Sequence, residues 1–155
     1  MKFLPGIFTA VVLLLSSAVN ANEIAVLLPI TGPMTPYEKS ELSKELITGL
    51  STKFELEYGE EVDRFVKQVF REESKKSDCD ETNCYRRIAS LYHAGKIVAF
   101  RVTEIDKGHF LVTAHLYDVP TGELVSTQKE ECNQCSFEKL KSLCKEFTGR
   151  MIKVK

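Results

Sequence analysis

The sequence predicts an α/β fold in which helices cover one mixed β-sheet. The first indication is a continuous apolar run at residues 24–28, which is typical of a strand buried on both faces. The second is a pair of helical patterns, each with one apolar face, on either side of a short strand pattern. The third is a group of three strand patterns separated by short turns and followed by a last helix. Strands and helices mixed in this way favour helices layered on a sheet.

The predicted elements follow the order β-α-β-α-α-β-β-β-α and form a single domain over residues 22–155. The first strand covers residues 23–30. A helix then starts at Thr35, the expected N-cap, with Pro36 as its first residue and Glu38 completing a capping box. The apolar face of this helix consists of Leu42, Leu46, Ile47 and Leu50.

A second strand and two further helices are predicted in the middle of the chain. Phe54, Leu56 and Tyr58 alternate with glutamates, as expected of a strand with one face in water. A third helix begins near Thr82, and we expect Gly95 to end it in the left-handed conformation. The second helix lies between this strand and the third helix. Its apolar residues have helical spacing and are Val62, Phe65, Val66, Val69 and Phe70.

Three strands and a helix complete the predicted domain. Strands at residues 96–105 and 109–118 are joined by a short hairpin loop that ends in Gly108. A turn leads to the next strand, at residues 123–129. The last helix covers residues 136–151, and its apolar face consists of Phe137, Leu140, Cys144, Phe147 and Met151.

The first 21 residues have the pattern of a secretory signal peptide. Lys2 supplies a positive start, residues 7–15 are almost continuously apolar, and small residues lead to Ala21. The apolar run is shorter than the roughly 20 residues that span a membrane, so we expect cleavage after Ala21 rather than an uncleaved anchor. No cysteine follows the apolar run directly, and a lipoprotein anchor is therefore not expected. The protein is predicted to be exported, to a periplasm or to the outside of the cell.

The chain has five cysteines, and an oxidising compartment favours two disulfides and one odd thiol. Cys79 and Cys84 flank a polar loop that enters a helix, so a local disulfide between them would hold this loop. A metal site is the alternative, but zinc needs about four ligands and no histidine lies close in the sequence. We expect two structural disulfides and no metal.

Cys132 and Cys135 lie between a predicted strand and a predicted helix, where thioredoxin-like proteins keep a redox pair. A helix N-terminus there would stabilise a thiolate, so a thiol-disulfide protein is the alternative function. The rest of the thioredoxin layout is absent, because no aromatic residue precedes the pair and the motif lies near the chain end. We expect a structural disulfide between the two, or a bond from one of them to Cys144. Cys144 itself is predicted to be a buried odd thiol.

No other pattern in the sequence indicates catalysis. It contains no glycine-rich phosphate loop, nucleophile elbow or zinc-protease helix motif. His109 and His115 share a strand face but lie about 20 Å apart, too far to share a metal. The formal net charge is −1, and the sequence contains no cluster of basic residues that would bind nucleic acid or a membrane surface. We expect no catalytic residue, no cofactor, no nucleic-acid partner and no stable membrane insertion.

Residues 79–122 resemble a group of bacterial envelope proteins. A cysteine pair is followed by a helix, by an apolar strand at residues 96–100, by a hairpin, and by an aspartate-to-glycine turn at residues 118–122. This arrangement resembles the superfamily that includes the TolB amino-terminal domain, CsgG and LpoB, whose opening strand resembles residues 24–29. The resemblance implies a non-enzymatic periplasmic module that docks on or regulates another envelope protein. This chain differs from CsgG and LpoB because we find no cysteine for lipidation in it. It also differs from CsgG because it offers no segment for membrane hairpins.

Overall fold

The computed structural model describes residues 23–76 and 80–154. The predicted signal peptide and its cleavage site after Ala21 lie outside these residues, and so does Cys79. The cleavage and the disulfide between Cys79 and Cys84 therefore stay predictions. The element order predicted from the sequence is confirmed. The elements are β1 (Glu23–Leu27), α1 (Pro36–Leu50), β2 (Phe54–Glu57), α2 (Glu60–Glu73), α3 (Glu81–Tyr92), β3 (Lys96–Asp106), β4 (His109–Asp118), β5 (Glu123–Asn133) and α4 (Phe137–Met151).

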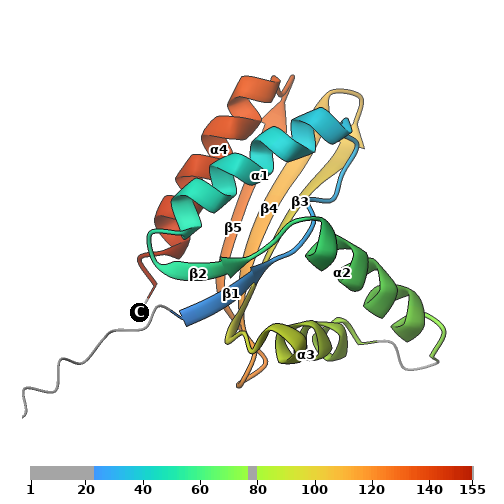
Figure 1. Cartoon of the computed structure of the whole chain (residues 1–155). Helices are drawn as coiled ribbons and strands as arrows, with labels where there is room; N and C mark the ends of the chain where they lie inside the picture. The colour runs from blue at the N-terminus through green and yellow to red at the C-terminus, as the bar shows by residue number, and fades with distance from the viewer. Residues whose placement is uncertain (1–22, 77–79, 155) are drawn as a thin grey trace, which may run out of the picture.

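The described strands form one mixed five-stranded sheet in the order β2-β1-β3-β4-β5. β1 lies between β2 and β3 and is parallel to both of them. β3, β4 and β5 form an antiparallel meander (Figure 1). The central position of β1 explains its continuous apolar sequence, because Ala25 and Val26 point to opposite faces and both are fully buried.

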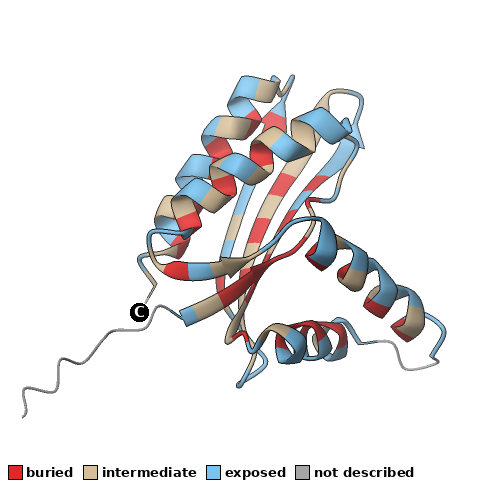
Figure 2. Cartoon of the chain, in the orientation of Figure 1, coloured by how far each residue is buried: buried red, intermediate tan, exposed pale blue. Residues whose placement is uncertain are grey.

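The two faces of the sheet carry separate cores. α1 and α4 lie side by side on one face, along the meander (Figure 1). α2 and α3 lie on the other face, where they cover β1 and the first part of β3 and reach Tyr117 near the end of β4. Beyond these two helices, no helix of the described residues covers the second face of the meander, and along β4 buried positions alternate with half-buried ones (Figure 2).

The predicted starts of the three helices that have a side-chain cap agree with the structure to within one residue. Thr35 Oγ1 accepts a hydrogen bond from the Glu38 N–H, and the Glu38 carboxylate accepts one from the Thr35 N–H, which completes the capping box. Ser136 caps α4 by accepting from the Lys139 N–H. α3 begins one residue before the predicted Thr82, because Asp80 supplies the cap.

Three predicted element ends are wrong. β1 ends at Leu27 and not at residue 30. The left-handed residue that ends α3 is His93, with φ of 52°, and not Gly95. His93 lies in solvent while the next residue, Ala94, is buried, so the chain must turn before Gly95 is reached. β5 continues to Asn133 instead of ending at residue 129, because β4 offers it a pairing partner as far as His109. Cys132 is therefore a strand residue.

Candidate functional site

A crevice lies at the carboxyl end of β1, beside the middle of β3. The chain leaves β1 through α1 on one face toward β2, whereas it leaves β3 by the hairpin to β4 in the opposite direction. β1 ends at Leu27 and β3 continues to Asp106, so only the connection after β1 borders the crevice. The segment after β1 stays beside β3, since the Thr31 N–H donates to the Phe100 carbonyl and the Val102 N–H to the Thr31 carbonyl.

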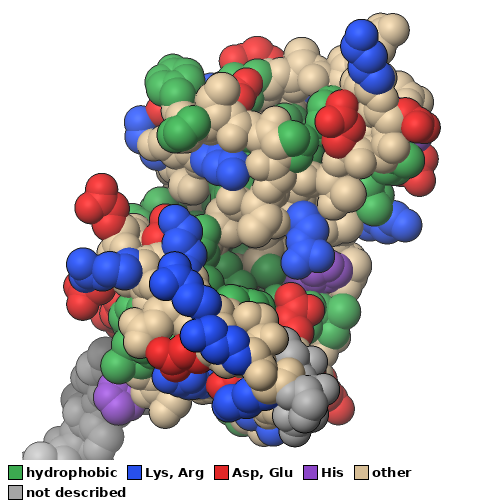
Figure 3. All heavy atoms as spheres, turned by 90° about the vertical axis from the view of Figure 1, so that its right-hand side faces the viewer, with side chains coloured by type: hydrophobic (Ala, Val, Ile, Leu, Met, Phe, Trp, Pro, Cys, Tyr) green, Lys and Arg blue, Asp and Glu red, His purple; other side chains and the backbone are tan. Residues whose placement is uncertain are grey.

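The crevice holds a cleft of about 520 Å³ between the sheet, α2 and the start of α3. Figure 3 shows it as a hollow with hydrophobic side chains at its bottom and Lys or Arg side chains beside it. The volume lies within the range of about 300–1,000 Å³ that is usual for ligand sites. We call this cavity the cleft throughout.

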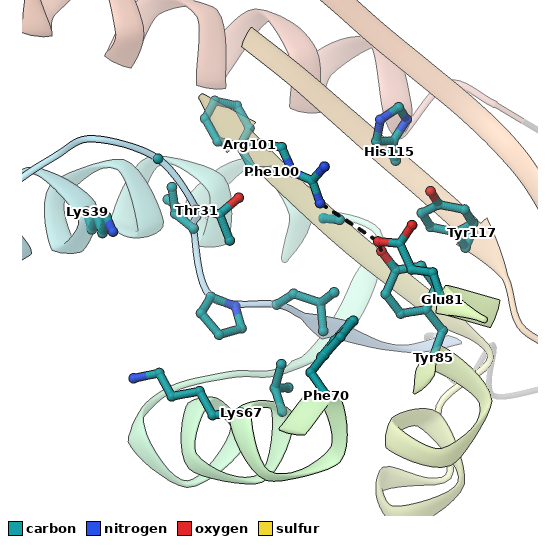
Figure 4. A pocket seen from close by; sticks show the side chains of 16 residues that line it. Thr31, Lys39, Lys67, Phe70, Glu81, Tyr85, Phe100, Arg101, His115 and Tyr117 are labelled. Atoms are coloured by element: carbon teal, nitrogen blue, oxygen red, sulfur yellow. Dashed lines mark hydrogen bonds and ion pairs between the residues drawn. The ribbon is translucent and has the colours of Figure 1, made fainter. Parts of the chain in front are cut away.

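Four rings form one wall of the cleft (Figure 4). Phe70 and Tyr85 meet edge to face with centroids 6.2 Å apart. Tyr85 and Tyr117 are 4.7 Å apart, and Tyr117 and His115 are 5.9 Å apart. The rings come from α2, α3 and β4, so only the packing of these elements brings them together.

The charged groups of the cleft are mostly cationic. Arg101 forms an ion pair with Glu81 at 3.8 Å, and the Tyr85 hydroxyl donates a hydrogen bond of 2.5 Å to the same carboxylate (Figure 4). Lys39 and Lys67 lie at the other end of the cleft and form no ion pair within the part of the chain that the structure describes. The cleft thus combines three cations with one carboxylate.

Burial shifts the titration of the groups along the ring wall. Desolvation, followed by the neighbouring Glu81, raises the pKa of the Tyr85 hydroxyl. Desolvation, followed by the charge of Arg101, lowers the pKa of His115. His115 is therefore neutral at pH 7, and its Nδ1 lies 3.2 Å from the Thr127 hydroxyl. The wall is uncharged, and the ionised groups lie around it.

The described cysteines take distinct positions. Cys132 and Cys135 form a disulfide with Cα atoms 5.2 Å apart, so the alternative bond to Cys144 is not formed. Cys135 precedes Ser136, the N-cap of α4, and Cys132 is buried at the end of β5. Cys144 is fully buried, and desolvation raises the pKa of its thiol to about 12. Cys84 is buried in α3, and its predicted bond to Cys79 involves a residue outside the described range.

No sequence pattern marked the cleft residues as a site: Val66 and Phe70 were predicted only as the apolar face of a helix, and His115 was considered only as a metal ligand. Among the described residues no group of three His, Cys, Asp or Glu side chains could hold a metal ion. One signal was available, since Arg101 ends the continuous apolar run of residues 97–100 in β3 and lies on the same face of the sheet as Ala99. The residues of α2 and α3 that lie near Arg101 could not be predicted, because they are far from it in the sequence.

Solved structures with a similar fold come from bacterial envelope proteins. The LpoB C-terminal domain from Salmonella enterica is 18% identical, with 76% of this chain and 87% of that chain covered and a TM-score of 0.49. Lipoprotein GNA1162 from Neisseria meningitidis is 10% identical, with 84% and 96% covered and a TM-score of 0.49. TolB from Acinetobacter baumannii is 11% identical, with 86% and 29% covered and a TM-score of 0.49.

These similarities concern the fold alone. No protein-family model and no curated protein sequence matches the chain. None of the helices in residues 23–76 and 80–154 is long and apolar enough to cross a membrane.

Proposed function

We propose that this chain is an exported, non-enzymatic module that docks on or regulates another protein of the cell envelope, by adding a strand of that partner to the free edge of β5. The proposal rests chiefly on the position of β5 at the end of the sheet. An edge strand presents a row of backbone N–H and C=O groups that another chain can pair with.

β5 has the length and the surface that such pairing needs. It is an 11-residue strand that pairs with β4 on one side, and no described strand lies on its other side. Residues 124–128 carry no charge, and Leu124 is 48% exposed. Charged residues, which proteins use to protect an edge from pairing, occur only at its beginning and from Lys129 onward.

The other edge of the sheet is a poorer docking site. β2 has four residues, and two of them are glutamates, Glu55 and Glu57. A short edge strand with repeated like charges discourages pairing. We therefore assign the partner to β5.

The periplasm is the proposed location. The signal-peptide pattern of the first 21 residues supports export, and the Cys132–Cys135 disulfide fits an oxidising compartment. We propose that this disulfide is structural. A helix N-terminus activates a cysteine that lies in its first turn, whereas Cys135 lies before the N-cap and Cys132 is buried in the strand.

Crosslinking in the native cell envelope tests the proposal. A tagged copy of the full chain should give one stoichiometric crosslink to an envelope protein. The Leu124→Lys variant places a charge on the open edge and should lose that crosslink. The matched control is Leu91→Lys, because Leu91 is exposed to a similar degree, at 53%, but lies on α3. A crosslink that survives Leu124→Lys, or the absence of any stoichiometric partner, would overturn the assignment.

A further inference from the structure

We propose that the cleft is a binding site for a small anionic ligand with a flat aromatic body. This site is separate from the docking edge, because no residue of β5 lines the cleft. The ligand class follows from the position and size of the cleft, from its ring wall and from its charge, which are independent observations.

Position and size favour a small molecule. The cleft lies at the carboxyl end of β1, beside the middle of β3, and its volume of about 520 Å³ fits a compact ligand. Its lining combines apolar side chains such as Leu28 and Val66 with a few polar groups. This combination is usual for sites that enclose most of a small ligand's surface and orient it by a few polar contacts.

The ring wall favours a flat aromatic body. Phe70, Tyr85, Tyr117 and His115 form a continuous series of ring contacts, so a planar ligand could pack against several of them at once (Figure 4). The Tyr85 hydroxyl already donates to Glu81, which holds this ring in place. The wall carries no ionised group at pH 7, so a ring that packs against it does not have to displace the water around a charge.

The charges favour an anion. Arg101 is separated from Glu81 by 3.8 Å, and both side chains are largely exposed, at 61% and 49%. An exposed pair at this distance is weak, so the guanidinium retains donors for a ligand carboxylate. Lys39 and Lys67 add positive charge at the other end of the cleft and form no ion pair with a described residue, although Asp63 lies close enough to Lys67 to feel its charge. A single anionic group would therefore be attracted from either end.

Three matched probes test the charge preference on the purified protein. Naphthoate, naphthamide and naphthylmethylamine share one ring system and differ in charge. We expect naphthoate to shift the NMR signals of the cleft residues and to bind roughly tenfold more tightly than naphthamide, as one charge-assisted contact would give. Naphthylmethylamine should bind more weakly than either. Equal affinities for the three probes, or signal shifts outside the cleft only, would overturn the proposal.

Two variants test which residues are responsible. The Arg101→Gln, Lys67→Gln double variant should lose most of the preference for naphthoate over naphthamide, because it removes two of the three positive charges of the cleft and leaves polar side chains in their place. The control is Lys129→Gln, since Lys129 lies in the same row of the sheet as Arg101, across Thr113, but outside the cleft. This control should bind naphthoate as the unaltered protein does. A double variant that keeps the full preference would contradict the assigned role of the cations.

The proposed function and the ligand site can fail separately. Leu124→Lys should abolish the envelope crosslink and leave naphthoate binding unchanged, since Leu124 does not line the cleft. The Arg101→Gln, Lys67→Gln variant should keep the envelope crosslink and lose most of its preference for naphthoate. Thermal unfolding of each variant verifies that the fold is retained, and the exposed position of all three side chains favours this.

Discussion

Gly49 of α1 lies directly against Thr148 of α4. A Cβ atom at position 49 would be 2.2 Å from the Thr148 hydroxyl oxygen and 2.6 Å from its Cβ. Thr148 is 1% exposed and cannot turn outward, and its hydroxyl donates to the Lys145 carbonyl. The close approach of the two helices that cover one face of the sheet therefore depends on the missing side chain at position 49.

Gly49→Ala should lower the free energy of unfolding by about 1–2 kcal/mol. Forcing the two helices apart costs about 1–3 kcal/mol, and the better helix propensity of alanine returns up to about 1 kcal/mol. The control is Gly149→Ala, because Gly149 is also helical but a Cβ there meets nothing within 4 Å. This control should raise stability by up to about 1 kcal/mol. Chemical denaturation measures both changes, and equal effects of the two substitutions would contradict the close contact.

Asp118→Asn should reduce the loss of stability in acid. Asp118 accepts hydrogen bonds from Lys96 Nζ at 2.6 Å and from the Thr121 hydroxyl at 2.6 Å, which lowers the pKa of its carboxyl to about 2. A lowered pKa in the folded state gives stability that is present above the ordinary value of 3.8 and is lost as the pH falls through about 2.

Denaturation at a series of pH values measures this contribution, which we expect to be about 1 kcal/mol after screening by solvent. The control is Asp106→Asn, because Asp106 is exposed at the hairpin and makes no ion pair with a described residue. The difference in stability between Asp118→Asn and the unaltered protein should be largest at neutral pH and should shrink below the ordinary pKa. A constant difference across this range would contradict the assignment.

Replacing both Cys132 and Cys135 by serine should lower stability by about 2 kcal/mol and change little else. The disulfide closes a loop with a sequence separation of 3, and chain entropy predicts a modest stabilisation for so short a loop. Reduction of the unaltered protein should give a similar loss, which serves as the control. If the double variant lost the envelope crosslink while its stability stayed intact, the disulfide would have a role beyond the structural one.

Local sequence rules accounted for most of the fold. The capping box at Thr35 and the apolar alternation of the strands depend on residues a few positions apart, so they were readable without the structure. The end of α3 could not be predicted from local sequence. The helix ends at His93 and not at Gly95 because Ala94 packs into the core between the helices and the sheet. The length of β5 was not readable either, since β4 supplies the pairing that extends it.

The sequence by itself determined the order of the elements, the α/β class and the expectation of export, because each depends on local pattern and composition. The tertiary structure alone decided which cysteine pairs with Cys132 and which residues form the cleft. Arg101 and Tyr117 meet Phe70 and Glu81 only when β3 and β4 pair and α2 and α3 pack across them. Those contacts join residues that are far apart along the chain, and a local pattern contains no information about them.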